Sequence, residues 1–262
     1  MPFDHHSQRV ALFVPCYIDQ LYPDVAWASL ELLEAHGVRA DVSEQQTCCG
    51  QALINTGAVA AAQPLGQRFA ATFADYDYVV CPSSSCTATL HRQAREASGQ
   101  RRPVRVLELC QFLVEVVGVV SIDVAFPYRV ALHESCHGLR ELGFGRPSEL
   151  GGGAAASSNP GRQLLSGVKE LRLVEPARAD ECCGFGGSFC IKEPEISTRM
   201  GDDRLDDFTR AGAQVVTSAD MSCLMHLGGL MQRQGRPLSV MHIAQILVGR
   251  PVPAAVAPRA RA

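Results

Sequence analysis

The chain has 262 residues, of which 47% are hydrophobic and 19% are charged, and its net charge is −3. This balance is typical of a globular protein, and the lack of a basic excess argues against nucleic-acid binding. No apolar run reaches the roughly eighteen residues of a membrane span, and Met1–Arg9 lacks an apolar signal segment. We therefore expect a cytoplasmic protein.

The first elements alternate between strand and helix. Apolar, β-branched residues at 10–14 predict a buried strand, and helically spaced apolar residues predict a helix over 25–35. A second strand is expected at 38–42, an alanine-rich helix at 58–73 and a third strand at 78–80. Such alternation predicts an α/β fold with a parallel sheet flanked by helices.

Several cysteines follow these strands. Cys16, Cys81 and Cys136 come directly after a predicted strand, whereas Cys86 and Cys223 are expected slightly further on, in the loops before the next helices. Open parallel sheets carry their functional groups beyond the carboxyl ends of their strands. The cysteines are therefore expected at the functional edge of the sheet.

The second half of the chain repeats landmarks of the first in the same order. Four landmarks match, which is strong evidence for an internal duplication. We predict two pseudo-symmetric halves, each a small parallel sheet flanked by helices, spanning 1–122 and 123–250. The first three pairs of landmarks are Arg9–Leu12 with Arg129–Leu132, Cys48–Gly50 with Cys182–Gly184, and Ser85–Cys86 with Ser222–Cys223; the fourth pair is 103–114 with 237–248.

Two segments fall outside this repeat. The stretch from Gly151 to Gly161 is rich in glycine, alanine and serine, so it is expected to be a loop inserted in the second half. The tail over 251–262 is rich in proline and alanine, and it is expected to be disordered.

Eleven cysteines is an unusual number for a chain of this length in a reducing compartment, and it favours metal or redox chemistry over disulfides. Thiolates are soft ligands that suit zinc, copper(I) and iron–sulfur clusters. Adjacent cysteines hold one small ion poorly but can reach different irons of a cluster, and the glycine after each pair allows a tight turn. Zinc and buried structural cysteines stay open as alternatives. The proposed ligands form one set in each half: Cys16, Cys48, Cys49 and Cys86, then Cys136, Cys182, Cys183 and Cys223.

Three cysteines lie outside the two sets. Cys110 aligns with Ala244 and is interpreted as structural. Cys190 follows a glycine pair and has no counterpart in the first half, so we expect a packed thiol beside the metal site, with ligation as an alternative. Cys81 ends a predicted strand and is a candidate extra ligand.

These residues resemble the cysteine-rich CCG domain family. That family includes the cysteine-rich subunit of heterodisulfide reductase and iron–sulfur subunits of glycolate- and glycerol-3-phosphate-oxidising systems, and the similarity is greatest to its lactate-utilisation members. It covers almost the whole chain, from Val10 to about Arg250. The motifs that carry it are Cys48–Gln51, Ser85–Thr87, His133–Cys136, Cys182–Ser197, Ala219–Cys223 and Val240–Ala244.

The resemblance implies iron–sulfur clusters. The fullest family pattern ends each half with a Cys-x-x-Cys, but Ser83 and Asp220 stand where the earlier cysteine would be. Four cysteines per half are compatible with one conventional [4Fe-4S] cluster in each half rather than with the non-cubane clusters of the reductase. Cys81 or Asp220 is a candidate auxiliary ligand.

The resemblance also implies a function. It indicates an electron-transfer subunit that helps to oxidise L-lactate to pyruvate with two co-encoded partner proteins, one of them a larger iron–sulfur protein. The alternatives are a thiol–disulfide redox subunit similar to heterodisulfide reductase, a subunit that oxidises glycolate or another 2-hydroxy acid, and a zinc-stabilised interaction module. No flavin site is evident and no catalytic residue is assigned, so the chain is interpreted as part of an oxidoreductase rather than as the enzyme alone.

Histidines near the cysteines are weaker candidates. His133 matches the family motif and is a candidate hydrogen-bond partner for cluster sulfur, ranked above His137. His242 aligns with Glu108, and both are interpreted as structural. The glycines of 184–187 lack the lysine of a phosphate-binding loop, which argues against nucleotide binding.

Overall fold

The structure is a computed structural model that describes residues 7–97, 104–145, 147–150 and 159–253. The chain divides into two compact units between Val120 and Ser121, and each unit is described by itself. Within the described residues, no helix is both long enough and apolar enough to cross a membrane.

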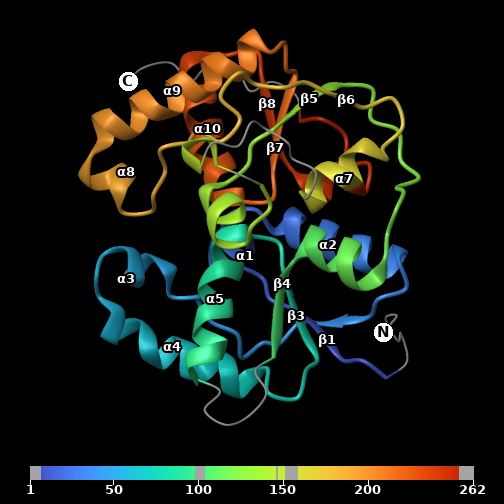
Figure 1. The fold of residues 1–262 in the computed structure, drawn as a ribbon, viewed down its shortest axis with the longest axis vertical. Helices are drawn as coiled ribbons and strands as arrows, with labels where there is room; N and C mark the ends of the chain where they lie inside the picture. The colour runs from blue at the N-terminus through green and yellow to red at the C-terminus, as the bar shows by residue number, and fades with distance from the viewer. Residues whose placement is uncertain (1–6, 98–103, 146, 151–158, 254–262) are drawn as a thin grey trace. The chain divides into compact units, whose positions relative to one another are not determined.

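The first unit alternates strands and helices as the sequence predicts, with α5 packed against β3 and β4, and α4 packed against α5 (Figure 1). Its elements are β1 (Val10–Leu12), α1 (Cys16–Leu21), α2 (Pro23–Ala35), β2 (Ala40–Asp41), α3 (Gln51–Asn55), α4 (Val59–Thr72), β3 (Tyr78–Cys81), α5 (Ser84–Ala97), β4 (Arg105–Glu108), α6 (Leu109–Gln111) and η1 (Phe112–Val117).

The first sheet has the strand order β2-β1-β3-β4, and every pair is parallel. The chain moves outward from β1 to β2, and then crosses back to β3 on the other side of β1. Two parallel strands whose connections leave in opposite directions form a crevice at their carboxyl ends, which is the usual binding position in open α/β sheets. In this unit, that crevice lies between the ends of β1 and β3.

The second unit repeats this plan, with α10 packed against β7 and β8, and α9 packed against α10 (Figure 1). Its elements are β5 (Arg129–Leu132), η2 (His137–Glu141), η3 (Ser148–Leu150), α7 (Pro160–Ser166), β6 (Arg172–Leu173), α8 (Phe189–Lys192), α9 (Pro194–Arg210), β7 (Val215–Ser218), α10 (Met221–Gln234), β8 (Ser239–His242) and α11 (Ile243–Leu247).

The second sheet has the parallel order β6-β5-β7-β8, the counterpart of the first sheet strand for strand. Its crevice therefore lies between the ends of β5 and β7. The prediction of two pseudo-symmetric α/β halves, each with a small parallel sheet, is confirmed by this topology.

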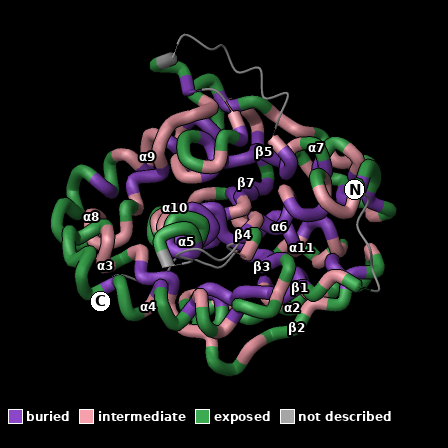
Figure 2. The backbone as a smooth tube through the Cα atoms, turned by 60° about the horizontal axis from the view of Figure 1, so that its bottom comes forward, coloured by how far each residue is buried: buried purple, intermediate pink, exposed green. Residues whose placement is uncertain are grey.

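The inner strands are the most buried part of each unit. β1, β3 and β7 are buried along their whole length, whereas the two-residue edge strands β2 and β6 are partly or fully exposed (Figure 2). A strand covered by helices on both faces is expected to be an uninterrupted apolar run, and short strands are typical of sheet edges. This explains why the sequence indicates the buried strands β1 and β3. The edge strand predicted at 38–42 is only two residues long in the structure.

Two sequence-based expectations need correction. Cys86 and Cys223 lie in the first turns of α5 and α10, not in the loops before them, because each helix begins directly after its strand. The expected loop from Gly151 to Gly161 is too long at its end, since α7 begins at Pro160. Residues 151–158 of that loop and 254–262 of the predicted tail lie outside the described residues.

Candidate metal centres

The first cysteine set gathers at the crevice of the first sheet. Cys16 begins α1 just after β1, Cys48 and Cys49 follow β2, and Cys86 follows β3. The sulfurs of Cys16 and Cys48 lie 3.8 Å apart, and those of Cys49 and Cys86 lie 3.2 Å apart. The parallel sheet therefore brings together four thiols that are far apart in sequence.

The set has a buried side and an open side. Cys49 and Cys86 are buried, Cys48 is half-buried and Cys16 is exposed. Hydrogen bonds from Cys16 and Cys49 lower the pKa of Cys48. The same Cys48–Cys49 hydrogen bond raises the pKa of Cys49. One sulfur in the set is thus stabilised as a thiolate by its neighbours, which is the form that binds metal.

The second set has the same arrangement. Cys136 follows β5, Cys182 and Cys183 follow β6, and Cys223 follows β7. Hydrogen bonds from Cys136 and Cys183 lower the pKa of Cys182, and hydrogen bonding with Cys182 raises the pKa of Cys183. Cys183 and Cys223 are buried, while Cys136 and Cys182 are half-buried.

The glycine after each cysteine pair has a left-handed backbone, with φ of 82° at Gly50 and 86° at Gly184. Residues with a side chain adopt this conformation at a cost of about 1–2 kcal/mol. The turn points the glycine amide back at the pair: the Gly50 N–H donates to Cys48 Sγ at 3.3 Å, and the Gly184 N–H donates to Cys182 Sγ at 3.4 Å. Such N–H groups stabilise negative charge on sulfur.

Helix amino termini add to this electrostatic environment. Cys86 and Cys223 lie in the first turns of α5 and α10, where the backbone N–H groups carry partial positive charge. At Cys223 the hydrogen bond with Cys183 lowers the pKa of the thiol, but burial and nearby negative charges together outweigh it and the net shift is upward.

Ser83 and Asp220, which stand where the family pattern has a cysteine, act as helix caps. Ser83 Oγ accepts a hydrogen bond from the Cys86 N–H at 3.3 Å. Asp220 is the N-cap of α10, and its carboxylate accepts from the Ser222 N–H at 3.2 Å and from Ser222 Oγ at 2.7 Å. Both side chains therefore have a structural use that does not need a metal.

We predict that Asp220→Asn keeps the metal content of the protein, while Asp220→Ala lowers its free energy of unfolding by about 1 kcal/mol. Asparagine caps a helix about as well as aspartate, and alanine does not. Metal analysis and denaturant unfolding of both variants test this. Loss of metal in Asp220→Asn would instead identify the carboxylate as a ligand.

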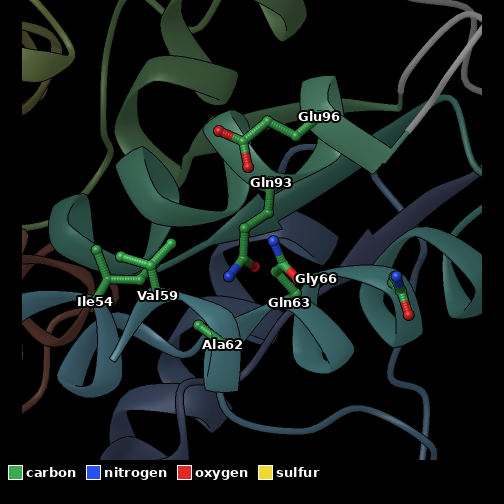
Figure 3. A pocket seen from close by; sticks show the side chains of 8 residues that line it. Ile54, Val59, Ala62, Gln63, Gly66, Gln93 and Glu96 are labelled. Carbon is green, nitrogen blue, oxygen red and sulfur yellow. The ribbon is translucent and has the colours of Figure 1, made fainter. Parts of the chain in front are cut away.

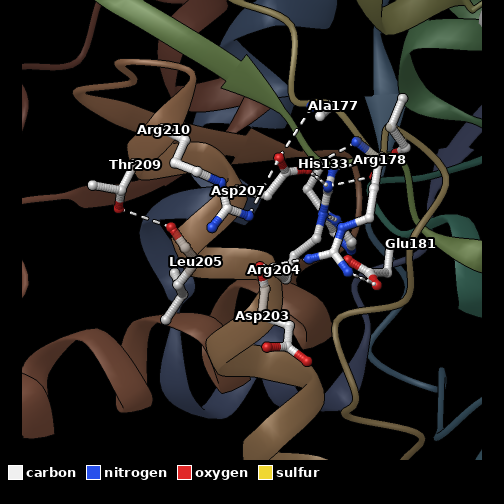
Figure 4. A network of polar contacts seen from close by, with 11 residues as sticks. His133, Ala177, Arg178, Glu181, Asp203, Arg204, Leu205, Asp207, Thr209 and Arg210 are labelled. Atoms are coloured by element: carbon white, nitrogen blue, oxygen red, sulfur yellow. Dashed lines mark hydrogen bonds and ion pairs between the residues drawn. The ribbon is translucent and has the colours of Figure 1, made fainter.

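A buried polar group beside the second set was only partly foreseen. His133 is almost fully buried, and one of its ring nitrogens lies within 4.8 Å of the sulfurs of both Cys183 and Cys223. Arg204 of α9 donates from Nε to His133 Nδ1 at 3.4 Å and pairs with Asp207 at 3.0 Å (Figure 4). The sequence motif pointed to His133 but not to Arg204. Arg204 shares the buried face of α9 with Gly201 and Phe208, and this helical spacing is the one sequence feature that could have indicated it.

The three remaining cysteines are hydrogen-bonded or packed in place. Cys81 is fully buried at the end of β3, in one apolar cluster with Cys49 and Cys86, and its thiol donates to the Ser83 carbonyl at 3.7 Å. Cys190 is half-buried, and its thiol donates to the Gly187 carbonyl at 3.0 Å. Burial raises the pKa of Cys110, which keeps that thiol protonated.

Two other histidines from the sequence analysis, His242 and His137, make local contacts. His242 caps α11, accepting at Nδ1 from the Ala244 N–H at 3.2 Å, and Glu108 caps α6 in the matching position of the first unit. This agrees with their interpretation as structural residues. His137 Nδ1 lies 3.6 Å from Cys136 Sγ, next to the second set.

A small cavity lies between α3, α4 and α5 of the first unit. It encloses about 250 Å³ and is lined by apolar residues, glutamines and Glu96. Figure 3 shows Gln93 of α5 reaching toward Ala62 and Gly66 of α4. Its lining contains no cysteine, so the cavity and the thiols are separate features.

The donors in each unit fit a thiolate-bound metal centre. Each set supplies four sulfurs from three separate segments of the chain, its neighbours lower the pKa of one of these thiols, and backbone N–H groups point at sulfur. Packing of cysteines as small apolar residues would not produce this twice in matching positions. Soft sulfur donors favour zinc or iron–sulfur clusters over magnesium or calcium.

Comparisons with known proteins agree with this arrangement. The family model for the cysteine-rich domain named CCG matches residues 10–91 and 130–228, one match in each unit. Lactate utilization protein A of Geobacillus kaustophilus is 39% identical over 92% of this chain and 99% of its own length. The protein of the same name in an Exiguobacterium strain is 37% identical over 91% of this chain and 96% of its own length. Among solved structures, an aspartate racemase of Picrophilus torridus aligns over 91% of this chain and 90% of its own, with 6% identity and a TM-score of 0.36.

Proposed function

Because the chain belongs to the cysteine-rich CCG domain family, we propose that it is an iron–sulfur electron-transfer subunit of a system that oxidises L-lactate to pyruvate. Each unit would hold one [4Fe-4S] cluster through its four cysteines. The observation that carries the proposal is the gathering of four thiols at the crevice of each sheet. The substrate is inferred from the relatives, which are named for lactate utilization.

The geometry supports electron transfer over substrate chemistry. Cys16, Cys48, Cys136 and Cys182 lie toward solvent while their neighbours are buried, so one side of each centre is open to a redox partner. Lactate oxidation releases two electrons, and two one-electron clusters could take one each. We propose that two co-encoded proteins supply the substrate site and carry the electrons onward.

The use of Ser83 and Asp220 as helix caps supports four thiolate ligands per half. A thiol–disulfide enzyme with non-cubane clusters would need the additional sulfurs that these residues replace. Their side-chain oxygens are engaged with Cys86 and Ser222 instead. The proposal therefore favours conventional clusters that relay electrons.

Zinc is the second candidate for the metal, and the distance between two sulfurs of the first set supports it. In a tetrahedral zinc site with Zn–S bonds of 2.3 Å, sulfurs lie about 3.8 Å apart, and the sulfurs of Cys16 and Cys48 are separated by 3.8 Å. A zinc-bound chain would be an interaction module without redox activity. Metal and sulfide analysis separates the two candidates.

Deleting the gene in its host tests the role in lactate oxidation. We expect loss of growth on L-lactate as the sole carbon source, with growth on pyruvate unchanged. The wild-type gene should restore growth, and a gene carrying both Cys48→Ser and Cys182→Ser should not. As a control for the cysteine changes, Cys110→Ala should restore growth, because Cys110 is buried outside both sets.

Growth of the deletion strain on L-lactate would refute the proposed substrate. If the deletion strain grows normally on L-lactate but fails to grow on glycolate, the substrate of the system is glycolate. Complementation by the double cysteine variant would show that the metal centres have no part in the function.

A further inference from the structure

The two cysteine sets are built alike but are backed by different side chains. On the inner side of the first set, Phe13 after β1 contacts Phe69 of α4 and Phe73, which directly follows that helix. Their ring centroids lie 5.9 and 6.2 Å from that of Phe13. These rings share one buried apolar cluster with Cys49 and Cys86. Among the residues that the structure describes, this cluster on the inner side of the first set contains no charged side chain.

The second unit places polar groups at the same positions. His133 follows Arg129–Leu132 as Phe13 follows Arg9–Leu12. In α9, Arg204 and Phe208 follow Gly201 with the spacing that Phe69 and Phe73 have after Gly66 in α4. The contacts correspond too: the Arg204 guanidinium lies 4.1 Å from the Phe208 ring centroid, and the His133 and Phe208 rings are 6.2 Å apart.

Arg204 fixes which nitrogen of His133 carries the proton. A guanidinium only donates hydrogen bonds, so His133 Nδ1, which receives the Arg204 Nε–H, must be the acceptor. With Nδ1 held as an acceptor, the proton of the imidazole ring lies on Nε2. A protonated nitrogen donates to sulfur and does not bind a metal.

His133 Nε2 is buried and has no hydrogen-bond partner among the described residues. Because Nδ1 is turned to Arg204, Nε2 is the nitrogen left for the nearby sulfurs of Cys183 and Cys223. A buried donor without an acceptor is unfavourable, because it has lost its hydrogen bonds to water. Negatively charged sulfur at the metal centre would satisfy it.

Arg204 brings a positive charge near the Cys183 sulfur, whose negative charge raises the pKa of the guanidinium. Its side chain is fully buried, and although burial lowers its pKa to about 10, the guanidinium stays charged at neutral pH. Asp207 opposes this charge at 3.0 Å, but its carboxylate also accepts the N–H groups of Ala177 and Arg178 at 3.1 and 3.0 Å. Figure 4 shows Arg204 lying among His133, Arg178 and Asp207.

We propose that His133 and Arg204 make the metal centre of the second unit easier to reduce than that of the first. Each centre gains one electron on reduction and becomes more negative. A hydrogen bond to sulfur and a nearby buried cation stabilise that added charge, whereas the phenylalanine rings of the first unit do not. His133 is a positioning residue that donates to sulfur through Nε2 and is not a ligand. The proposal rests on the proposed iron–sulfur function.

Redox titration of the full, iron-loaded chain followed by EPR tests this. We expect two midpoint potentials, the higher belonging to the second unit, with Cys48→Ser and Cys182→Ser used to assign them. His133→Phe installs the residue of the first unit. It should lower the higher potential by at least about 59 mV, which corresponds to a tenfold change in the one-electron equilibrium constant. His133→Gln keeps an amide donor and should retain most of the potential. Phe13→Leu should leave the second unit's potential unchanged.

Several results would overturn the proposal. Equal potentials in the wild-type protein, or a higher potential in the first unit, would do so whether or not the variants hold iron. Loss of iron from the second unit in both His133→Phe and His133→Gln would make His133 a ligand. A wild-type chain with zinc and no sulfide would refute the iron–sulfur function and this proposal together, whereas iron clusters with equal potentials would refute this proposal alone.

Discussion

Replacing Cys182 with serine is expected to remove the iron of the second unit and to leave that of the first, which is about half of the total if each unit holds one cluster. Cys182 is the sulfur that its neighbours stabilise as a thiolate, and it accepts the Gly184 N–H at 3.4 Å. Serine offers a hard oxygen that matches soft metal chemistry poorly. Iron and sulfide analysis, together with the EPR spectrum of the reduced protein, measures the loss.

The duplicated chain supplies its own controls for that result. Cys48→Ser should give the reciprocal loss, because Cys48 has the same position in the first unit. Cys110→Ala should keep all the iron, since Cys110 is fully buried outside both sets. If Cys182→Ser and Cys183→Ser each keep full iron and sulfide, the assignment of ligands to the second unit is wrong.

Gly184→Ala is expected to lower the free energy of unfolding by about 2–5 kcal/mol and to impair metal binding in the second unit. A β-carbon at Gly184 would lie 2.6 Å from the Ser197 carbonyl oxygen and 2.8 Å from Met200 Cβ, in a backbone with φ of 86°. The left-handed backbone contributes about 1–2 kcal/mol and the overpacking about 1–3 kcal/mol. Denaturant unfolding and iron analysis of the purified variant measure both effects.

Gly57 is a matched control for this substitution. Its φ is 83°, but a β-carbon there would meet no atom within 4 Å. Gly57→Ala should therefore carry only the backbone cost of about 1–2 kcal/mol and keep its metal. Equal losses of stability in the two variants would show that the close approach of α9 to the Cys-Cys-Gly turn contributes nothing.

Much of the fold could be predicted because its signals are local. The buried runs that became β1 and β3 are continuous and apolar, and repeated landmarks revealed the duplication before any pairing of strands was known. The turn at Gly50 and Gly184 was also foreseen, since a glycine directly after two cysteines indicates an unusual backbone. These features depend on neighbours in sequence.

The rest depends on tertiary contacts that sequence patterns do not carry. Cys86 and Cys223 were expected in loops, but Ser83 and Asp220 cap the helices before them, so the helices start earlier. Arg204 looks like one of many surface arginines in sequence, and only the packing of α9 buries it against His133. The surroundings of the two cysteine sets are therefore less predictable than the sets themselves.

The central claim is that each unit holds an iron–sulfur cluster through its four cysteines. The most direct measurement is the content of iron, acid-labile sulfide and zinc per chain in protein purified without oxygen. We expect about eight irons and eight sulfides per chain with no stoichiometric zinc. Zinc without sulfide would contradict it, and would leave two thiolate zinc sites that stabilise the fold and carry no electrons.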